Sequence, residues 1–399
     1  MVLKEVVEKV DMEDFLEFPR TLYSHDPNWV PPMDDEIKGV FDPSTNRLLN
    51  EGGQSVKWLA IDESKRVVGR IAAFFDGKDA GGNSVLSGGI GFFECIDDRK
   101  VAHELFDIAV DWLKSKGVQA VDAPVNFGEN NAYWGLLVEG FTLPAYGMNY
   151  HMPYYRELFE SYGFKLYFKQ FSYRLDMTKE FPERFWKIAK WVCSKPHYTF
   201  KHFEWSQADK FINDMVEVYN QAWADFKEDF TPLSPKDVRN NMEKAKAVID
   251  KEMVWFAYFK DEPIAFYIMF PDANQILRHL NGKMNLWNKL KFLYYKKTGA
   301  ITRARAQAAG VVPRFQNSGV ESGIFWQLKH VMDRKPRYKE VELSWVGDFN
   351  PRMLSIYEAV GAEHYKTHHT YRYMIDQSIP FERYMPEKLD SSIARKVIK

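Results

Sequence analysis

The sequence predicts an α/β chain, of the mixed α+β kind, that forms two similar lobes one after the other. The chain has 399 residues, which is enough for two or three domains of usual size. Segments with the alternating pattern of strands follow segments with the 3.6-residue period of helices along its whole length. Each half also runs strand, helices, hairpin, strand, helix, strand, helix, strand, and this shared order indicates a structural repeat.

The composition excludes several classes of protein. The chain is 45% hydrophobic and 16% aromatic, which supplies ample core material, and its net charge of −1 predicts no general affinity for polyanions. Its two cysteines, Cys95 and Cys193, are too far apart for a disulfide framework or a zinc site. The first ten residues are too charged for a signal peptide, and no apolar run reaches about 18 residues. A cytoplasmic protein without a spanning helix is therefore expected.

Charged turns and helix caps mark the ends of several expected elements in the first half. The charged segment 62–66 separates two alternating runs and predicts a hairpin. Asp97 and Asp98 favour a helix N-terminus, and Gly117 favours the end of that helix. The expected elements are a strand at 4–10, a helix around 15–23, hairpin strands at 56–61 and 67–75, a strand at 90–96, a helix at 97–113, a strand at 118–125, a helix at 153–162 and a strand at 167–175.

The second half repeats this order after a connecting segment at 177–197. Its expected elements are a strand at 198–205, helices at 208–226 and 234–249, hairpin strands at 254–259 and 264–270, a strand at 301–312, a helix from 320, a strand at 338–346, a helix at 351–359 and a hairpin or paired strands at 362–375. An insertion at 275–300 interrupts the order. The predicted domains are thus a first lobe at 1–176, a second lobe at 198–375 and a C-terminal extension at 376–399.

A strand, a turn and a helix follow one another closely at 311–331. The apolar run ends at Pro313, which cannot donate to a central ladder, and apolar residues recur at helical spacing from Val320. A helix that starts just after a strand directs several unpaired N–H groups at one place, and its dipole favours an anion there. This interpretation predicts a site for a phosphate-bearing cofactor. The alternative interpretation is an ordinary strand–turn–helix of an α/β core without a ligand.

A second motif lies about 40 residues downstream. Asn350 can cap the helix at 351–359, and Gly361 can end it. Tyr357 lies within this helix, where its phenol either packs in the core or donates a proton to a leaving group.

The two motifs together carry a family resemblance. They are Val312-x-Arg314-Phe315-Gln316-x-x-Gly319-Val320-x-Ser322 and Asn350-x6-Tyr357-Glu358-x-x-Gly361-Ala362. They resemble the acetyl-CoA loop and the final helix of the GCN5-related N-acetyltransferase (GNAT) superfamily. The resemblance implies two tandem lobes, each a mixed, mostly antiparallel sheet flanked by helices, and acetyl-CoA or another acyl-CoA as co-substrate without a metal. It places these residues at the cofactor: Val311, Val312, Gln316, Asn317, Ser318, Gly319, Val320, Ser322 and Asn350.

The resemblance also implies a reaction. The strand at 341–345 would splay from its neighbour to admit the acyl group, and Tyr357 would protonate the departing thiolate. A small-molecule or peptide amine would attack the thioester directly, and Glu321, Glu342 and His364 are candidates for the base, with Glu321 preferred. Glu321 departs from the family pattern, because it stands where that loop has a small residue. A carboxylate about 5 Å from a phosphate costs about 1 kcal/mol per charge pair in a water-like dielectric.

The first half lacks the acyl-CoA motif but has an unusual loop. Segment 97–102 has two acids and no glycine, so we expect a degenerate lobe that does not hold CoA in the usual way. Segment 126–155 concentrates aromatic and hydrogen-bonding side chains, and long loops of this kind often line sites. The predicted acceptor-binding residues are Asn131, Tyr133, Trp134, Tyr150 and Tyr154. The alternative is a loop that packs its aromatic side chains against the other half.

The insertion at 275–300 is basic and has no acidic residue. Its simplest interpretation is a solvated charged face over a hydrophobic stripe. The functional interpretations are a lid that steers a polyphosphate cofactor, nucleic-acid contact, or association with an acidic membrane surface. From the whole sequence we expect an acyltransferase without a stable nucleic-acid or membrane partner. An aminoacyl-tRNA-dependent transferase of the peptidoglycan-bridge type and a catalytically degenerate binding module remain the alternatives.

Overall fold

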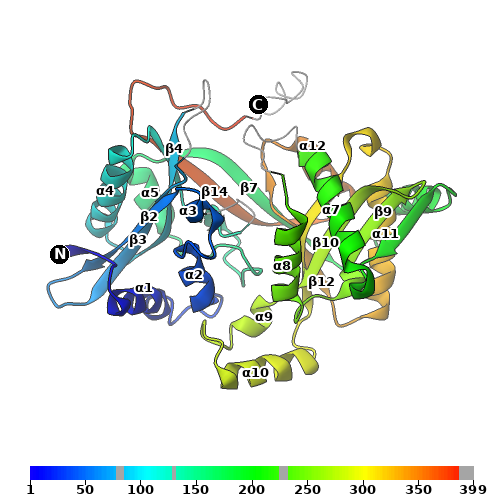
Figure 1. Cartoon of the computed structure of the whole chain (residues 1–399), viewed down its shortest axis with the longest axis horizontal. Helices are drawn as coiled ribbons and strands as arrows, with labels where there is room; N and C mark the ends of the chain where they lie inside the picture. The colour runs from blue at the N-terminus through cyan, green and yellow to red at the C-terminus, as the bar shows by residue number, and fades with distance from the viewer. Residues whose placement is uncertain (78–84, 128–131, 224–231, 386–399) are drawn as a thin grey trace. The chain divides into compact units, whose positions relative to one another are not determined.

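The computed structural model describes residues 1–77, 85–127, 132–223 and 232–385 (Figure 1), and the chain divides into two compact units. Unit 1 comprises Met1–Phe171, Ile276–Tyr294 and Lys366–Tyr384. Unit 2 comprises Ser172–Gln275, Tyr295–Tyr365 and the C-terminal residues from Met385.

Unit 1 is a mixed sheet with helices packed on it. Its sheet runs in the order β1, β2, β3, β4, β5, β14, β7, with β4 and β5 parallel and the pairs β1–β2, β2–β3, β3–β4 and β5–β14 antiparallel. The elements that begin in this unit are β1 (Val2–Glu5), α1 (Lys9–Leu22), α2 (Asp34–Val40), α3 (Arg47–Asn50), β2 (Gln54–Ile61), β3 (Val67–Phe75), β4 (Ser87–Cys95), α4 (Arg99–Ser115), β5 (Ala120–Ala123), β6 (Leu136–Glu139), α5 (Tyr155–Tyr162) and β7 (Lys165–Asp176).

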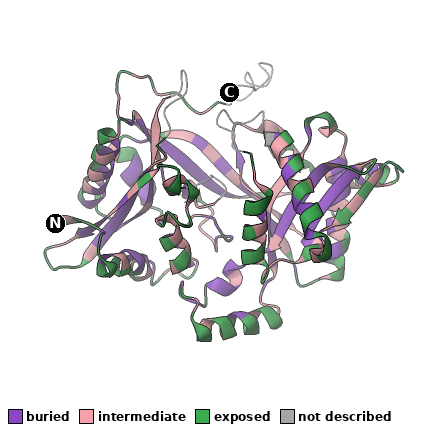
Figure 2. Cartoon of the chain, viewed as in Figure 1, coloured by how far each residue is buried: buried purple, intermediate pink, exposed green. Residues whose placement is uncertain are grey.

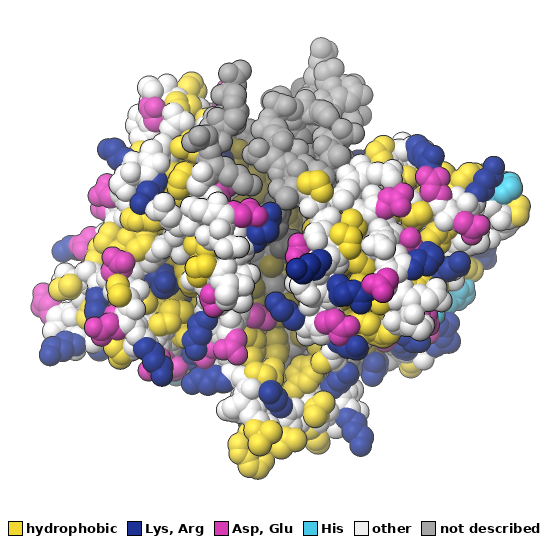
Figure 3. Space-filling model, viewed as in Figure 1, with side chains coloured by type: hydrophobic (Ala, Val, Ile, Leu, Met, Phe, Trp, Pro, Cys, Tyr) yellow, Lys and Arg dark blue, Asp and Glu magenta, His cyan; other side chains and the backbone are white. Residues whose placement is uncertain are grey.

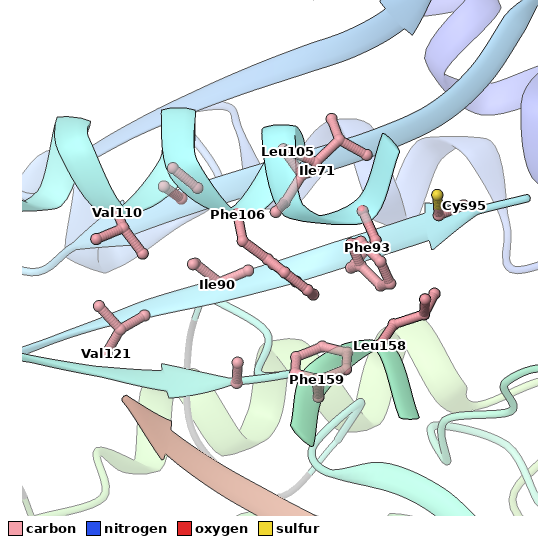
Figure 4. Close-up of a cluster of buried hydrophobic side chains, with 14 of the residues drawn as sticks. Ile71, Ile90, Phe93, Cys95, Leu105, Phe106, Val110, Val121, Leu158 and Phe159 are labelled. Carbon is pink, nitrogen blue, oxygen red and sulfur yellow. The ribbon is translucent and has the colours of Figure 1, made fainter. Parts of the chain in front are cut away.

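The core of unit 1 lies between α4 and the strands beneath it. The apolar face of α4 packs Leu105 and Phe106 onto the sheet, and α5 adds Phe159 (Figure 4). The rings of Phe93 and Phe106 stack with their centroids 4.6 Å apart. This packing follows from the helical spacing of the apolar residues of α4, which places them on one side of the helix.

Unit 2 repeats the pattern. Its sheet runs in the order β7, β12, β11, β10, β9, β8, with β11 and β12 parallel and the other pairs antiparallel. The chain continues with elements most of which lie in unit 2, whereas most residues of α10 and β14 belong to unit 1. These elements are α6 (Glu183–Cys193), β8 (Tyr198–His202), η1 (Trp205–Gln207), α7 (Ala208–Trp223), α8 (Pro235–Ala245), η2 (Lys251–Met253), β9 (Val254–Phe259), β10 (Glu262–Pro271), α9 (Asn274–Leu277), α10 (Leu286–Lys297), β11 (Arg303–Val311), η3 (Pro313–Phe315), α11 (Val320–Arg334), β12 (Glu340–Glu342), β13 (Val346–Gly347), α12 (Pro351–Ala359) and β14 (Glu363–Met374).

Helices cover both faces of the unit 2 sheet. Phe211 of α7 packs on Phe256 of β9, and Phe325 of α11 packs on Tyr267 of β10, with ring centroids 5.0 Å apart in both pairs. Phe256 pairs with Phe266, the neighbour of Tyr267, so the two contacts are on opposite faces. Figure 2 shows the strands between these helices as largely buried. This double cover fits β9, in which five of six residues are buried without alternation.

Three predicted elements differ from the structure. The segment predicted as a strand at 4–10 is strand only as far as Glu5, the end of β1, and helix α1 already begins at Lys9. The segment predicted as one strand at 338–346 forms only β12 and the two-residue β13. The segment predicted as a hairpin or paired strands at 362–375 forms a single strand of 12 residues, β14, whose part from Lys366 belongs to unit 1. Among the described residues, no helix combines the length and the apolar character that crossing a bilayer requires.

Candidate acyl-CoA site

The loop between β11 and α11 leaves the N-terminus of α11 open. Its backbone is left-handed at Asn317, with φ 69°, and at Gly319, with φ 81°. Gly319 is the N-cap of α11 and contributes no side-chain hydrogen bond to the first turn. A β-carbon at Gly319 would lie 2.7 Å from Ile188 of α6, so both its backbone and its surroundings favour glycine. The amide of Val320 donates to the Ser318 hydroxyl over 3.4 Å, and an anion can take the place of this long hydrogen bond.

Arg352 lies beside this loop and was not anticipated from the sequence. It is half-buried in the first turn of α12, and its guanidinium donates a hydrogen bond to the side-chain oxygen of Gln316. The side-chain amide of Gln316 in turn donates to the carbonyl of Val311, over 3.4 Å. A guanidinium next to a helix N-terminus strengthens a site for phosphate. Its sequence signal is an arginine two residues after the cap Asn350, whose oxygen accepts from the amide of Met353.

Glu321 adds a negative charge beside this loop. Its side chain is half-buried in the first turn of α11. Burial raises the pKa of this carboxyl, while a hydrogen bond from its own backbone N–H and the charge of Arg352 lower it. The carboxylate thus uses one of the amides that an incoming phosphate would use.

Strands β11 and β12 separate just before this loop. Their parallel pairing covers only Arg303 to Arg305 of β11, and it ends at the pair of Arg305 with Glu342. Beyond that point the amide of Leu343 bonds to the carbonyl of Tyr173 instead. The β11–β10 register also shifts between Ile268 and Met269, where β11 carries one extra residue, Gln307. The edge of β11 from Gln307 to Val311 therefore has no strand partner on the β12 side among the described residues. We call this divergence the splay.

Tyr357 reaches the beginning of the splay from α12. Its hydroxyl donates to the carbonyl of Ser344, 3.1 Å away, and the Ser344 hydroxyl donates to the carbonyl of Ala306 on β11. The side chain is buried, and burial raises the pKa of the phenol well above its usual value, against the Ser344 hydrogen bond. Tyr357 is therefore protonated at neutral pH, as a proton donor must be.

The two other candidate bases occupy different surroundings. Glu342 is 1% exposed and lies 3.4 Å from Arg303, which also binds Asp272, so its carboxylate belongs to a buried ion cluster. His364 is exposed, and its ring packs edge-on against Tyr173, which packs in the same way against Tyr357. Of the three candidates, only Glu321 lies at the N-terminus of α11.

In unit 1, the helix N-terminus and the strand pair that correspond to the loop and the splay already make contacts within the protein. The N-cap of α4 is Asp98, whose carboxylate accepts from the amides of Lys100 and Val101 at 2.8 and 3.2 Å. The strands β4 and β5 stay together, because the amide of Val125 bonds to the carbonyl of Ile90 at 2.8 Å. The helix N-terminus thus already holds an anionic group, and unit 1 has no counterpart of the splay among its described residues.

The predicted acceptor-binding residues all belong to unit 1. Asn131 lies outside the described residues. The hydroxyls of Tyr133, Tyr150 and Tyr154 bond to Glu36, Asp26 and the carbonyl of Cys95, respectively. The indole N–H of Trp134 is buried without a hydrogen-bond partner in the described part of the chain. The structure places Tyr133 near Glu36 and Tyr150 near Asp26, and it does not gather the four side chains into one cluster.

Comparison with known proteins identifies the family. The chain is 30% identical to the bacterial ceramide synthase of Caulobacter vibrioides over 366 residues, which cover 90% of this chain and 94% of that protein. The chain belongs to the family of this ceramide synthase. No protein-family model matches it.

Similarity to solved structures shows the fold of the present chain. The chain is similar to a tandem GNAT protein from the clavulanic acid biosynthesis pathway, with TM-score 0.53, 11% identity and coverage of 96% of this chain and all of that one. It also resembles a fungal GH3 beta-N-acetylglucosaminidase that contains a GCN5-related glucosamine N-acetyltransferase region, with TM-score 0.56 and 12% identity. That match covers 93% of this chain but only 38% of the fungal one. The predicted tandem GNAT fold is confirmed.

In this member of the ceramide synthase family, the residues of unit 2 fit an acyl-CoA. The uncapped turn at Gly319 and the guanidinium of Arg352 suit a pyrophosphate, and the free edge of β11 can pair with an amide-bearing arm. The carboxylate of Glu321 opposes the binding of a pyrophosphate at this turn. No group of three or more potential metal ligands occurs among the described residues.

Proposed function

We propose that the chain is an acyltransferase that moves an acyl group from acyl-CoA to the amine of a long-chain amino alcohol. The observation that carries the proposal is the splay in unit 2, with the Tyr357 hydroxyl at its start and the open helix N-terminus at its end. The acceptor class rests on the name of the Caulobacter relative, since a ceramide is the amide of a fatty acid and a long-chain amino alcohol.

Each group has a defined role in this proposal. The N–H groups at the start of α11 and the side chain of Arg352 bind the pyrophosphate. The unpaired backbone of β11 at the splay donates to the oxygen on which charge develops as the amine attacks. Tyr357 gives its proton to the departing thiolate. Glu321 is one of the three candidates for the base, and burial raises the pKa of its carboxyl above the usual value.

The direct test supplies acyl donors of several chain lengths and compares a long-chain amino alcohol with short, water-soluble amines. We expect thiol release and an N-acyl product, identified by mass spectrometry, to be greatest with long-chain acyl-CoA and the long-chain amine. The proposal fails if calorimetry detects no acyl-CoA binding at millimolar concentration, or if aminoacyl-tRNA rather than acyl-CoA donates the acyl group.

Glu321 should make acyl-CoA binding depend on pH. Because burial raises its pKa, the carboxyl is neutral below that pKa and becomes negative, and repulsive to pyrophosphate, as the pH rises through it. The Kd for acyl-CoA of the wild-type protein should therefore increase with pH. In Glu321→Gln the increase should disappear, and the affinity at high pH should improve by roughly fivefold to tenfold, since each charge pair is worth about 1 kcal/mol.

The same variant separates the two roles of Glu321. If Glu321 is the base, Glu321→Gln lowers kcat while it tightens binding, and if Glu321 only opposes binding, kcat is unchanged. Glu358→Gln is a matched control, because Glu358 is an exposed glutamate of α12 in the same unit. A Kd of Glu321→Gln that changes with pH as the wild-type Kd does would show that Glu321 does not face the pyrophosphate.

A further inference from the structure

Helix α10 exposes apolar side chains that a folded domain normally buries. Phe292 is its one buried residue, and the side chain of Asn288 anchors the same side of the helix to the carbonyls of Leu280 and Lys283 at 2.8 and 2.7 Å. The exposed apolar residues, with their exposed fractions, are Leu286 (74%), Trp287 (75%), Leu290 (51%), Leu293 (59%) and Tyr294 (64%). Figure 2 shows α10 exposed along most of its length. The hydrophobic stripe expected beneath a charged face is thus on the outside.

The exposed apolar residues form one continuous face. At about 100° per residue, Leu286, Leu290 and Leu293 project in one direction, with Trp287 and Tyr294 along one border, so the face spans an arc of about 120°. Phe292 and Asn288 lie on the opposite side, where they hold the helix in place. Figure 3 shows hydrophobic side chains gathered over α10 with Lys and Arg side chains among and beside them. We call this surface the α10 face.

Lysines surround the α10 face, and acids are absent from it. Lys289 and Lys291 lie on its two flanks, Lys297 lies within the arc, and Lys283 precedes the helix, all with exposed side chains. The sequence between Asp272 and Glu321 contains no Asp or Glu, so no acid of this segment neutralises them. The centre of an interface between two proteins is usually depleted of charged residues. Leucines at the centre, aromatic residues at the border and lysines around them are instead typical of a helix that lies in a membrane interface.

We propose that α10 docks the protein on the surface of an anionic lipid bilayer, with the α10 face buried at the boundary between headgroups and acyl chains. The lysines supply attraction to anionic headgroups, and the apolar residues supply burial in the interface. The sequence alone predicts no stable membrane partner, and the exposure of these five side chains is the observation that favours one. The proposal does not depend on the proposed acyl transfer.

Vesicle sedimentation of the full chain tests the proposal. The protein is mixed with vesicles of phosphatidylcholine alone or of equal parts phosphatidylcholine and phosphatidylglycerol, and the bound fraction is measured. We expect binding to the anionic vesicles and weak binding to the neutral ones. Trp287→Ser/Leu290→Ser and Lys289→Glu/Lys291→Glu should each lower the partition coefficient by about tenfold or more, because these changes remove interfacial burial and reverse two charges.

Matched controls alter equally exposed residues elsewhere. Trp191→Ser/Val7→Ser changes residues that are 57% and 76% exposed, and Lys236→Glu/Lys244→Glu changes two exposed lysines of α8. Both controls should bind vesicles within about twofold of wild type, since neither touches the α10 face. Circular dichroism should show the same fold for every variant, because all the altered side chains are exposed.

Three outcomes would overturn the proposal. The wild-type protein could remain in the supernatant with anionic vesicles, or the α10 variants could bind as the wild type does. Alternatively, the wild type could be a dimer that binds no vesicles and that becomes a monomer in Trp287→Ser/Leu290→Ser, as seen by analytical ultracentrifugation. The α10 face would then be an interface between two copies of this chain.

Discussion

Replacing Arg303 by methionine is expected to lower the free energy of unfolding by about 3–5 kcal/mol, because it removes the buried cation that offsets the charges of two buried carboxylates. The guanidinium of Arg303 lies 2.6 Å from Asp272 and 3.4 Å from Glu342, and the three side chains are at most 2% exposed. The cluster ties the end of β10 to the first paired residue of β11, Arg303, and to the last paired residue of β12, Glu342. Chemical denaturation measures the loss.

Two comparisons separate the buried charges from a general effect of substitution. Arg334→Met removes an exposed pair with Glu252 and should cost no more than about 1 kcal/mol. The triple variant Arg303→Met/Asp272→Asn/Glu342→Gln should recover a substantial part of the stability lost in Arg303→Met, because it also removes the two negative charges that the guanidinium offset. Equal losses in Arg303→Met and Arg334→Met would contradict the role assigned to the cluster.

Local signals in the sequence predicted the elements on which they act directly. The alternating runs on either side of 62–66 gave the hairpin of β2 and β3, which pairs Val56 with Ala73 and Ile61 with Val67. The cap Asn350 and the terminator Gly361 gave α12 with its observed ends. In these cases the stabilising groups lie within a few residues of the element that they define.

Longer-range interactions account for the elements that were wrong. The strand expected at 338–346 is interrupted between β12 and β13, and within this gap Leu343 bonds to Tyr173 of β7, a residue far away in sequence. The last segment was expected as a hairpin or paired strands, but it forms one strand whose C-terminal part pairs with β5 in unit 1. No local pattern records such pairings, because periodicity reports only which side of a segment is buried.

The candidate site was predicted in part. The loop at Gly319 and Tyr357 follow from the family motif, whereas Arg352 acts on the loop from a different helix, and only the folded chain brings it to Gln316. Association of the insertion at 275–300 with an acidic membrane surface was one interpretation of the sequence, but it was not preferred, because apolar residues at helical spacing usually indicate a buried stripe. Exposure alone distinguishes an interfacial helix from a core helix.

Tyr357→Phe is expected to lower kcat for acyl transfer by about 10²–10³-fold, with the Kd for acyl-CoA unchanged within about twofold. The substitution removes only the hydroxyl at the start of the splay, which bonds to Ser344. Single-turnover kinetics and calorimetry measure the two quantities. Tyr338→Phe is the matched control, because Tyr338 is also buried in unit 2 and its hydroxyl bonds to Arg337 instead. The control should keep full activity.

The choice of acyl donor distinguishes a proton donor from a structural hydroxyl. Loss of the hydroxyl also leaves the Ser344 carbonyl without this hydrogen bond, which costs about 1–3 kcal/mol of stability and could lower activity indirectly. An aryl thioester releases a thiolate that needs no proton, so the deficit of Tyr357→Phe should shrink to within about threefold of wild type with that donor. A purely structural defect would be the same with both donors, because it does not depend on the basicity of the leaving thiolate. An equal deficit with both donors would therefore remove Tyr357 from the chemical step and leave it a packing role beside the splay.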